Sequence, residues 1–212
     1  MLTHERRAWK DGFLHVAGVD EAGRGPLAGP VTAAAVLFRA QTLRSTKQRK
    51  PWDELNDSKQ LTEKKRDRLF EALTTDDTVR WAVISVEPKE IDQVNILNAT
   101  HLAMARALSE LQTGDPAPDL ALVDGLPVNG LPLDHRAIVK GDSASLSIAA
   151  ASIIAKVTRD RFMVQLAADF PEYGFERHKG YGTKAHLEAL REHGPCPQHR
   201  RSFRPVAQME LF

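Results

Sequence analysis

Two adjacent carboxylates close an apolar stretch and are followed at once by a glycine-arginine-glycine turn. The segment HVAGV ends in Asp20 and Glu21, and Gly23, Arg24 and Gly25 come next. Glycines let a ligand approach backbone N–H groups, while arginine offers a planar fork of donors to phosphate or hydroxyl oxygens. The pattern indicates a metal site beside a surface that binds a polyanion. A hairpin turn with two solvated acids is the structural alternative.

Two further acids occupy equivalent places downstream. The apolar run LALV ends in Asp124 and Gly125, and a short apolar segment ending at Val139 is soon followed by Asp142. Open α/β sheets bind ligands outside the carboxyl ends of their strands, so acids at several such ends can converge. Taken singly, Asp124 could head an ordinary Asp-Gly turn and Asp142 could cap a helix. The candidate set is Asp20, Glu21, Asp124 and Asp142.

A set of this kind favours a hard divalent cation. Closely packed carboxylates repel one another and raise one another's pKa unless a cation lies between them. Oxygen-only donors suit Mg²⁺ or Mn²⁺, and a pair of ions suits in-line phosphoryl displacement. We exclude Asp160 because it follows Asp142 by 18 residues, which an unbroken helix spaces by about 27 Å.

Five apolar segments are predicted to be the strands that position these acids, and the first three are expected to form an antiparallel meander. They are Val16–Asp20, Val31–Phe38, Thr78–Val86, Leu120–Asp124 and Ala137–Val139. Helices are predicted over TEKKRDRLFEAL, over about Ile96–Leu111, over the Ala/Ile-rich segment that ends before Pro171, and over TKAHLEALREH. A stripe on the second of these is expected to pack in the core: Ile96, Thr100, Ala103, Met104, Ala107 and Leu111.

The length and composition suit one α/β domain, since the chain has 212 residues and 42% of them are hydrophobic. We expect a core over about residues 15–170, a C-terminal loop and helix over about 171–204, and a tail over 205–212. The net charge is only +1, but residues 39–68 hold ten Lys/Arg against five Asp/Glu, and residues 177–204 hold seven against two. Two basic segments beside an acidic cleft would suit a duplex held on both sides, although charged runs are often only solvated faces.

These motifs together resemble bacterial ribonuclease HII. The resemblance rests on DEAGRGPLAGPV, LNDSKQL, NILNAT, LVDG, KGDSASLSIAAASIIAKVTRD and YGFERHKGYGT, and it runs from about Val16 to Phe203. It implies a ribonuclease H-like fold, with a mixed five-stranded sheet flanked by helices and a C-terminal helical extension. It also implies hydrolysis of the RNA strand of RNA/DNA hybrids and nicking of duplex DNA 5′ to an embedded ribonucleotide, leaving a 3′-hydroxyl and a 5′-phosphate. The implied setting is ribonucleotide removal during DNA replication and repair.

The resemblance assigns roles to individual residues. Asp20, Glu21, Asp124 and Asp142 would bind Mg²⁺ or Mn²⁺, the same set that the residues themselves suggest. The 2′-hydroxyl would be read by Gly23, Arg24, Gly25 and Tyr181, and the backbone of the DNA strand would be contacted by Asn56, Ser58 and Lys59. For Tyr181 the alternative is a buried core tyrosine, and for LNDSKQL it is a capped turn before a helix.

The end of the chain carries a motif outside this core. Residues 208–212, QMELF, resemble the short Q-L-x-L-F peptides that dock on the bacterial sliding clamp, with Leu211 and Phe212 as anchors and Gln208 fixing the register. A tail without a partner is the alternative. The single cysteine, Cys196, gives no disulfide framework, and zinc is not expected there.

We expect a cytoplasmic monomer without a membrane anchor, because MLTHERRAWKDG lacks the apolar core of a signal peptide and no apolar run approaches membrane length. The absence of room for a domain before Val16 leans against ribonuclease HIII. Two other functions stay open: a non-catalytic module that binds RNA/DNA hybrids, and a nuclease of related fold that cuts another substrate such as a four-way junction.

Overall fold

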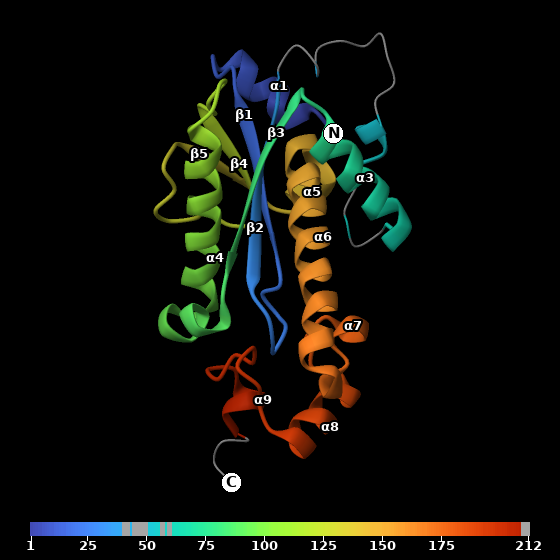
Figure 1. The fold of residues 1–212 in the computed structure, drawn as a ribbon. Helices are drawn as coiled ribbons and strands as arrows, with labels where there is room; N and C mark the ends of the chain where they lie inside the picture. Colours follow the sequence, from blue (N-terminus) through green and yellow to red (C-terminus); the bar gives the residue numbers. More distant parts are fainter. Residues whose placement is uncertain (40–42, 44–50, 56–57, 59–60, 209–212) are drawn as a thin grey trace.

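The computed structural model describes residues 1–39, 43, 51–55, 58 and 61–208, arranged as a central sheet with a long helix on each face (Figure 1). The strands are β1 Val16–Ala22, β2 Val31–Phe38, β3 Val79–Val86, β4 Leu120–Asp124 and β5 His135–Ile138. The α-helices are α1 Thr3–Lys10, α3 Glu63–Thr75, α4 Pro88–Gln112, α5 Gly141–Ala144, α6 Leu146–Asp169, α7 Phe175–His178, α8 Lys184–His193 and α9 Arg204–Ala207. Two 3₁₀ turns, η1 Pro51–Glu54 and η3 Pro171–Tyr173, complete the described elements.

The sheet is mixed, with the strand order β3-β2-β1-β4-β5. Antiparallel pairs join β1 to β2 and β2 to β3, which confirms the predicted meander. Parallel pairs join β1 to β4 and β4 to β5. Because β1, β4 and β5 run the same way, their carboxyl ends meet at one edge of the sheet, where the four candidate acids stand.

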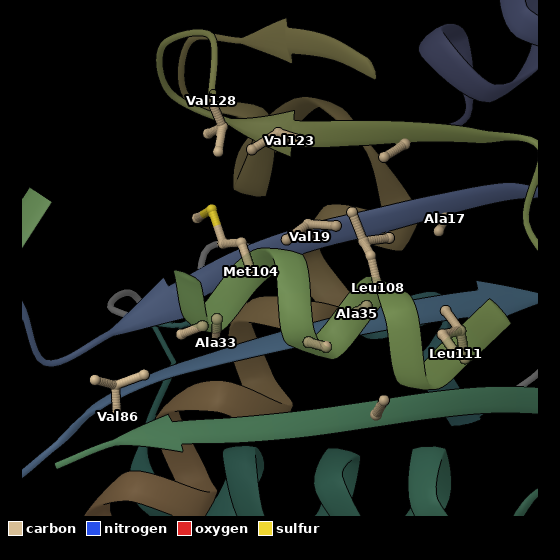
Figure 2. Packing of buried hydrophobic residues seen from close by; sticks show 14 of the residues in the cluster. Ala17, Val19, Ala33, Ala35, Val86, Met104, Leu108, Leu111, Val123 and Val128 are labelled. Atoms are coloured by element: carbon tan, nitrogen blue, oxygen red, sulfur yellow. The ribbon is translucent and has the colours of Figure 1, made fainter. Parts of the chain in front are cut away.

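One face of the sheet is covered by α4. Figure 2 shows Met104, Leu108 and Leu111 of this helix pointing at β1 and β2, against Val19 and Ala35. The predicted stripe is therefore correct, with Thr100, Ala103, Met104, Ala107 and Leu111 buried and Ile96 packed at its margin. Small alanines on the strands let the helix pack closely on this face of the sheet.

The other face is covered by α6, which begins almost in contact with β1. A Cβ on Gly18 would lie 2.0 Å from the carbonyl carbon of Ser147, so a glycine is required there. Ser145 caps the helix by accepting a hydrogen bond from the N–H of Ile148. The close approach lets α6 run along β1, so that Ser152, in the second turn of the helix, hydrogen-bonds Asp20.

Several predicted boundaries shift by a few residues. β1 continues to Ala22, and β5 lies earlier than predicted, at His135–Ile138. α4 begins at Pro88, earlier than predicted, and Asn95, at φ +66°, interrupts it. The side-chain oxygen of Asn95 accepts the N–H groups of Leu97 and Asn98 and so caps the second part of the helix. The predicted helix over Ile96–Leu111 is the second part of α4. The helix α1 was not predicted.

The C-terminal segment folds back against the β1–β2 connection (Figure 1). The N–H of Leu27 donates to the carbonyl of Gly180, the N–H of Gly29 to that of Gln198, and the N–H of Arg200 to that of Leu27. Thr183 caps α8 and Gly194 follows its end, as predicted. In the part of the chain that the structure describes, no helix is long and apolar enough to span a bilayer.

Candidate active site

The first two acids lie on β1, and the parallel register brings a third beside them. Val19 is aligned with Val123 on β4, so the next residues, Asp20 and Asp124, are neighbours at the carboxyl ends of the two strands. This pairing supports a shared site over separate turn roles for the two acids. Because adjacent strand residues point to opposite faces, Glu21 is less buried than Asp20.

Asp20 is a buried carboxyl whose pKa is raised by its surroundings. It is only 6% exposed, and burial, followed by the charges of Glu21 and Asp124, raises its pKa well above 3.8. Hydrogen bonds from Ser152 and from the N–H of Glu21, at 2.7 Å, act in the opposite direction. The net effect is a carboxylate whose charged form is disfavoured as long as no cation is near.

The fourth acid is tied to the third through one backbone contact. The N–H of Gly141 donates to Oδ1 of Asp124 at 2.6 Å, and Asp142 is the next residue, largely buried. Asp142 lies inside the short helix α5, and Ser145 is the cap of α6, so Asp142 does not cap the long helix. A direct link to Asp124 instead places α5 at the acidic edge.

The chemistry of these donors fits a divalent cation. All four side chains offer only oxygen, and the raised pKa of Asp20 shows the repulsion that a cation would relieve. Within the described residues, no three acidic, histidine or cysteine side chains are already gathered as a finished metal site. Their role as ligands therefore stays a prediction that rests on donor type, burial and charge.

The predicted recognition residues meet beside the acids. Glu21, Gly23, Arg24, Gly25 and Tyr181 line one cavity of about 280 Å³, together with Ser58, Ser152, Lys156 and Arg159. A Cβ on Gly25 would lie 3.7 Å from the Tyr181 ring, which places the ring directly against the turn. Tyr181 is 46% exposed, so the alternative of a core tyrosine is wrong.

Two buried arginines hold the loops that carry these recognition residues. Arg159 donates through Nε to the carbonyl of Pro30 at 2.9 Å, through Nη2 to that of Ala28 and through Nη1 to that of Lys179. Arg200 donates to the carbonyls of Gly23, Arg24, Gly29 and Pro30 at 2.6 to 3.0 Å. We call residues 23–30 and 179–181, joined in this way, the two-loop platform.

Both arginines remain charged at neutral pH despite their burial. Burial, and then the charge of Arg159, lowers the pKa of Arg200 to about 9. Burial also lowers the pKa of Arg159. The Asp92 carboxylate, which accepts the N–H groups of Arg201 and Ser202, favours the charged form of Arg200.

A histidine pair supports Tyr181 from the other side. The N–H of Cys196 donates to Nδ1 of His199 at 3.0 Å, so His199 carries its proton on Nε2 and donates to Nε2 of His186 at 2.9 Å. His186 then donates from Nδ1 to the carbonyl of Tyr181 at 2.9 Å. Burial lowers the pKa of both rings to about 4, which keeps them neutral and keeps this directed chain of bonds intact.

The LNDSKQL residues are only partly described. Ser58 is buried, and its hydroxyl shares a 2.8 Å hydrogen bond with that of Ser152, which also bonds Asp20. This position connects the segment to the acids. Asn56 and Lys59 lie outside the described residues, as do Leu211, Phe212 and most of the basic segment between residues 40 and 60.

Several residues of this site were missed in the sequence. Ser152, Lys156 and Arg159 lie on one face of α6, at a spacing that a helix brings together. This polar spacing within an Ala/Ile-rich helix was an available signal. Arg200 had none, because its role depends on contacts with residues more than 170 positions away.

The chain is similar to known proteins over nearly its whole length. The family model described as Ribonuclease HII matches residues 17–206. The ribonuclease HII of Desulfitobacterium hafniense is 50% identical over 98% of this chain and 75% of its own. The ribonuclease H2 structure from Pyrococcus horikoshii superposes with a TM-score of 0.75 and 30% identity, covering 93% of this chain and 97% of its own. Archaeoglobus fulgidus ribonuclease HII, solved as a complex with PCNA, gives 0.72 and 28%, over 90% and 95% of the two chains.

Proposed function

The chain belongs to the ribonuclease HII family, and from this premise we propose that it hydrolyses the RNA strand of RNA/DNA hybrids and nicks duplex DNA 5′ to an embedded ribonucleotide. As a family member it is a metal-dependent nuclease of the ribonuclease H type. The proposed products carry a 3′-hydroxyl and a 5′-phosphate. The proposed setting is the removal of ribonucleotides during replication and repair, in the cytoplasm, by a monomer in which residues 1–212 form one catalytic unit.

One observation carries the proposal. Asp20, whose pKa is raised by burial and by the charges of Glu21 and Asp124, lies beside a cavity lined by the glycine-arginine-glycine turn and Tyr181. We propose Asp20, Glu21, Asp124 and Asp142 as the residues that hold Mg²⁺ or Mn²⁺, with two ions bound during catalysis. When bound, such cations supply a water nucleophile at neutral pH and stabilise the charge that develops on the leaving oxygen.

Other residues of the chain would bind and orient the substrate. We propose that Gly23, Arg24, Gly25 and Tyr181 bind the ribose and orient the scissile phosphate toward the acids, since the 2′-hydroxyl is what distinguishes RNA from DNA at one position. Tyr181 offers a ring that can pack on a sugar, and Arg24 offers donors to oxygen. Asn56, Ser58 and Lys59 are proposed to hold the opposite DNA strand, with the burial of Ser58 tying that segment to Asp20 through Ser152.

The test is cleavage of a DNA duplex that contains one ribonucleotide, beside an RNA/DNA hybrid and an all-DNA duplex, in Mg²⁺ and in Mn²⁺. A single nick 5′ to the ribonucleotide, lost in Asp124→Asn and kept in Asp169→Asn, is expected. Asp169 is an exposed acid at the far end of α6 and serves as the matched control. Metal-dependent binding without cleavage would favour a binding module, and cleavage of four-way junctions would favour a nuclease for another substrate.

We also propose that residues 208–212 dock on the bacterial sliding clamp, with Gln208, Leu211 and Phe212 as the contacts. Two observations support this: the sequence QMELF, and the solved complex of Archaeoglobus fulgidus ribonuclease HII with PCNA. A tether to the clamp would raise the local concentration of the nuclease on newly replicated DNA. Unchanged clamp affinity after deletion of residues 208–212, measured by titration calorimetry, would overturn the proposal.

A further inference from the structure

In the part of the chain that the structure describes, the acceptors of the buried Arg159 and Arg200 guanidinium groups are all backbone carbonyls of the two-loop platform. Among the described residues, Arg159 donates three such hydrogen bonds and Arg200 donates four. Within the described residues neither guanidinium forms an ion pair within 4.0 Å. Two like charges, 1% and 0% exposed, thus lie directly behind the cavity that holds the glycine-arginine-glycine turn.

The direction of these bonds fixes the direction of the turn. In a planar trans peptide the N–H points opposite to the carbonyl of the preceding residue. Because the Gly23 and Arg24 carbonyls point to Arg200, the N–H groups of Arg24 and Gly25 point away from it. In the described part of the chain neither N–H group donates a hydrogen bond to another protein group. Two aligned donors backed by positive charge favour an anion or a hydroxyl oxygen.

The packing leaves little freedom for another arrangement. A Cβ on Gly23, which has φ +95°, would lie 2.1 Å from Nε of Arg159, so the turn rests on this guanidinium without a side chain between them. Both arginines donate to the one carbonyl of Pro30, which links their positions. Arg159 also holds the Lys179 carbonyl, two residues before Tyr181. A change in either arginine therefore reaches both recognition loops.

We propose that Arg159 and Arg200 are positioning residues for ribose selection. They hold the platform's carbonyls toward the interior and thereby direct the Arg24 and Gly25 N–H groups, with the Tyr181 ring, at the sugar and phosphate of a ribonucleotide. The inference rests on the proposed function, because it concerns the same substrate. It extends that function to two residues that themselves stay behind the site.

The test substitutions remove the planar set of donors on each arginine and keep its positive charge. Arg200→Lys and Arg159→Lys retain a cation but cannot donate to several carbonyls in one plane. Arg161→Lys is the matched control, since Arg161 lies two residues after Arg159 on α6, is exposed, and pairs with Asp67 away from the platform. Each change is made in the Asp124→Asn background for binding and in the otherwise wild-type chain for cleavage.

The decisive readout is a ratio of dissociation constants, measured with Ca²⁺ for a duplex with one ribonucleotide and for the same duplex with a deoxyribonucleotide. This ratio does not depend on the fraction of folded protein. We expect the preference for the ribonucleotide to fall by about tenfold in both platform variants, which corresponds to one lost hydrogen bond to the sugar. We further expect kcat to fall by about 10²-fold with KM nearly unchanged, as for a misplaced reacting group. Arg161→Lys should change neither quantity.

An unchanged ratio in a folded Arg200→Lys or Arg159→Lys variant would overturn the inference and leave the pair a structural role only. If both variants fail to fold, amide NMR of the Asp124→Asn chain decides: the Arg24 and Gly25 N–H signals should shift with the ribonucleotide duplex and much less with the all-DNA duplex. Equal shifts would also overturn it. Failure of the wild-type chain to cleave either substrate would instead count against the proposed function.

Discussion

The carboxylate cluster of Asp20, Glu21, Asp124 and Asp142 and the two-loop platform lie side by side but are stabilised in opposite ways. In the cluster, burial, followed by the charges of Glu21 and Asp124, raises the pKa of Asp20. In the platform, two buried cations are already surrounded by carbonyl acceptors, and the backbone is fixed. The cluster is therefore defined by carboxylates that raise one another's pKa, whereas the platform is held by hydrogen bonds from two buried cations. Binding a cation should change the first region and leave the second as it is.

The largest expected effect comes from breaking the cluster. Asp20→Asn should lower kcat/KM on a duplex with one ribonucleotide by on the order of 10³-fold, about 4 kcal/mol of transition-state stabilisation. Without divalent metal the same change should raise the free energy of unfolding by about 1–2 kcal/mol, because it removes a buried charge that Glu21 and Asp124 oppose. Cleavage kinetics test the expected fall in kcat/KM, and urea unfolding without metal tests the expected rise in the free energy of unfolding. A loss of both activity and metal-free stability would show that Asp20 is mainly structural.

Acid should weaken the platform through its histidine pair. Because burial lowers the pKa of His186 and His199 to about 4, they contribute stability fully above the unfolded value near 6.5, and this is lost as the pH falls through about 4. The expected loss is on the order of 3 kcal/mol for the pair, which shares one hydrogen bond. Urea unfolding between pH 4 and 7.5 measures it.

The matched variants are His199→Asn and His193→Gln, the latter at an exposed histidine of α8. His199→Asn should flatten the dependence of stability on pH, and His193→Gln should keep it. Equal slopes for the wild type and His199→Asn would rule out the pair as its source.

Metal should stabilise the cluster and spare the platform. At one hundred times its dissociation constant, Mn²⁺ should add about 2.7 kcal/mol to the free energy of unfolding, a rise in Tm of roughly 5–10 °C. Scanning calorimetry with Mn²⁺ and with EDTA measures this. Asp124→Asn should reduce the shift, while Arg200→Lys should leave it intact, because among the described residues Arg200 donates to platform carbonyls and to none of the four acids.

The smallest expected effect compares two helix caps. Thr183 accepts the N–H of His186 at 3.3 Å, and Thr62 accepts that of Lys65 at 3.4 Å, so Thr183→Ala and Thr62→Ala should each cost about 1 kcal/mol of stability. Only Thr183 lies in the Tyr181 loop, where its N–H donates to the Tyr181 carbonyl, and only its loss should lower ribonucleotide selectivity. Equal selectivity in the two variants would mean that the start of α8 does not support the platform.

Much of the fold could be predicted from the sequence because the patterns that specify its strands and helices are local. The five strands, the meander, the caps at Thr183 and Gly194, and the buried stripe of α4 all follow from periodicity and from residues that begin or end helices. The interruption of α4 at Asn95 was missed, since a left-handed asparagine inside a helical pattern leaves no sequence signal. The helix α1 was missed because its buried residue Ala8 packs on β1 and β4, and β4 lies more than 100 residues away in the sequence.

The sequence by itself determined which residues are candidates for the chemistry: acids at the ends of apolar strands, glycines beside an arginine, and a tyrosine in a glycine-rich loop are choices of residue type that the chain states directly. The tertiary structure decided how they are held. The pKa of Asp20 is raised because the packed sheet buries it and because Glu21 and, across the β1–β4 pair, Asp124 lie near it. The recognition loops become one platform only because Arg159 and Arg200, far apart in the chain, reach their carbonyls. Residue type is local, whereas burial and the partners of a charge depend on packing between segments that folding alone brings together.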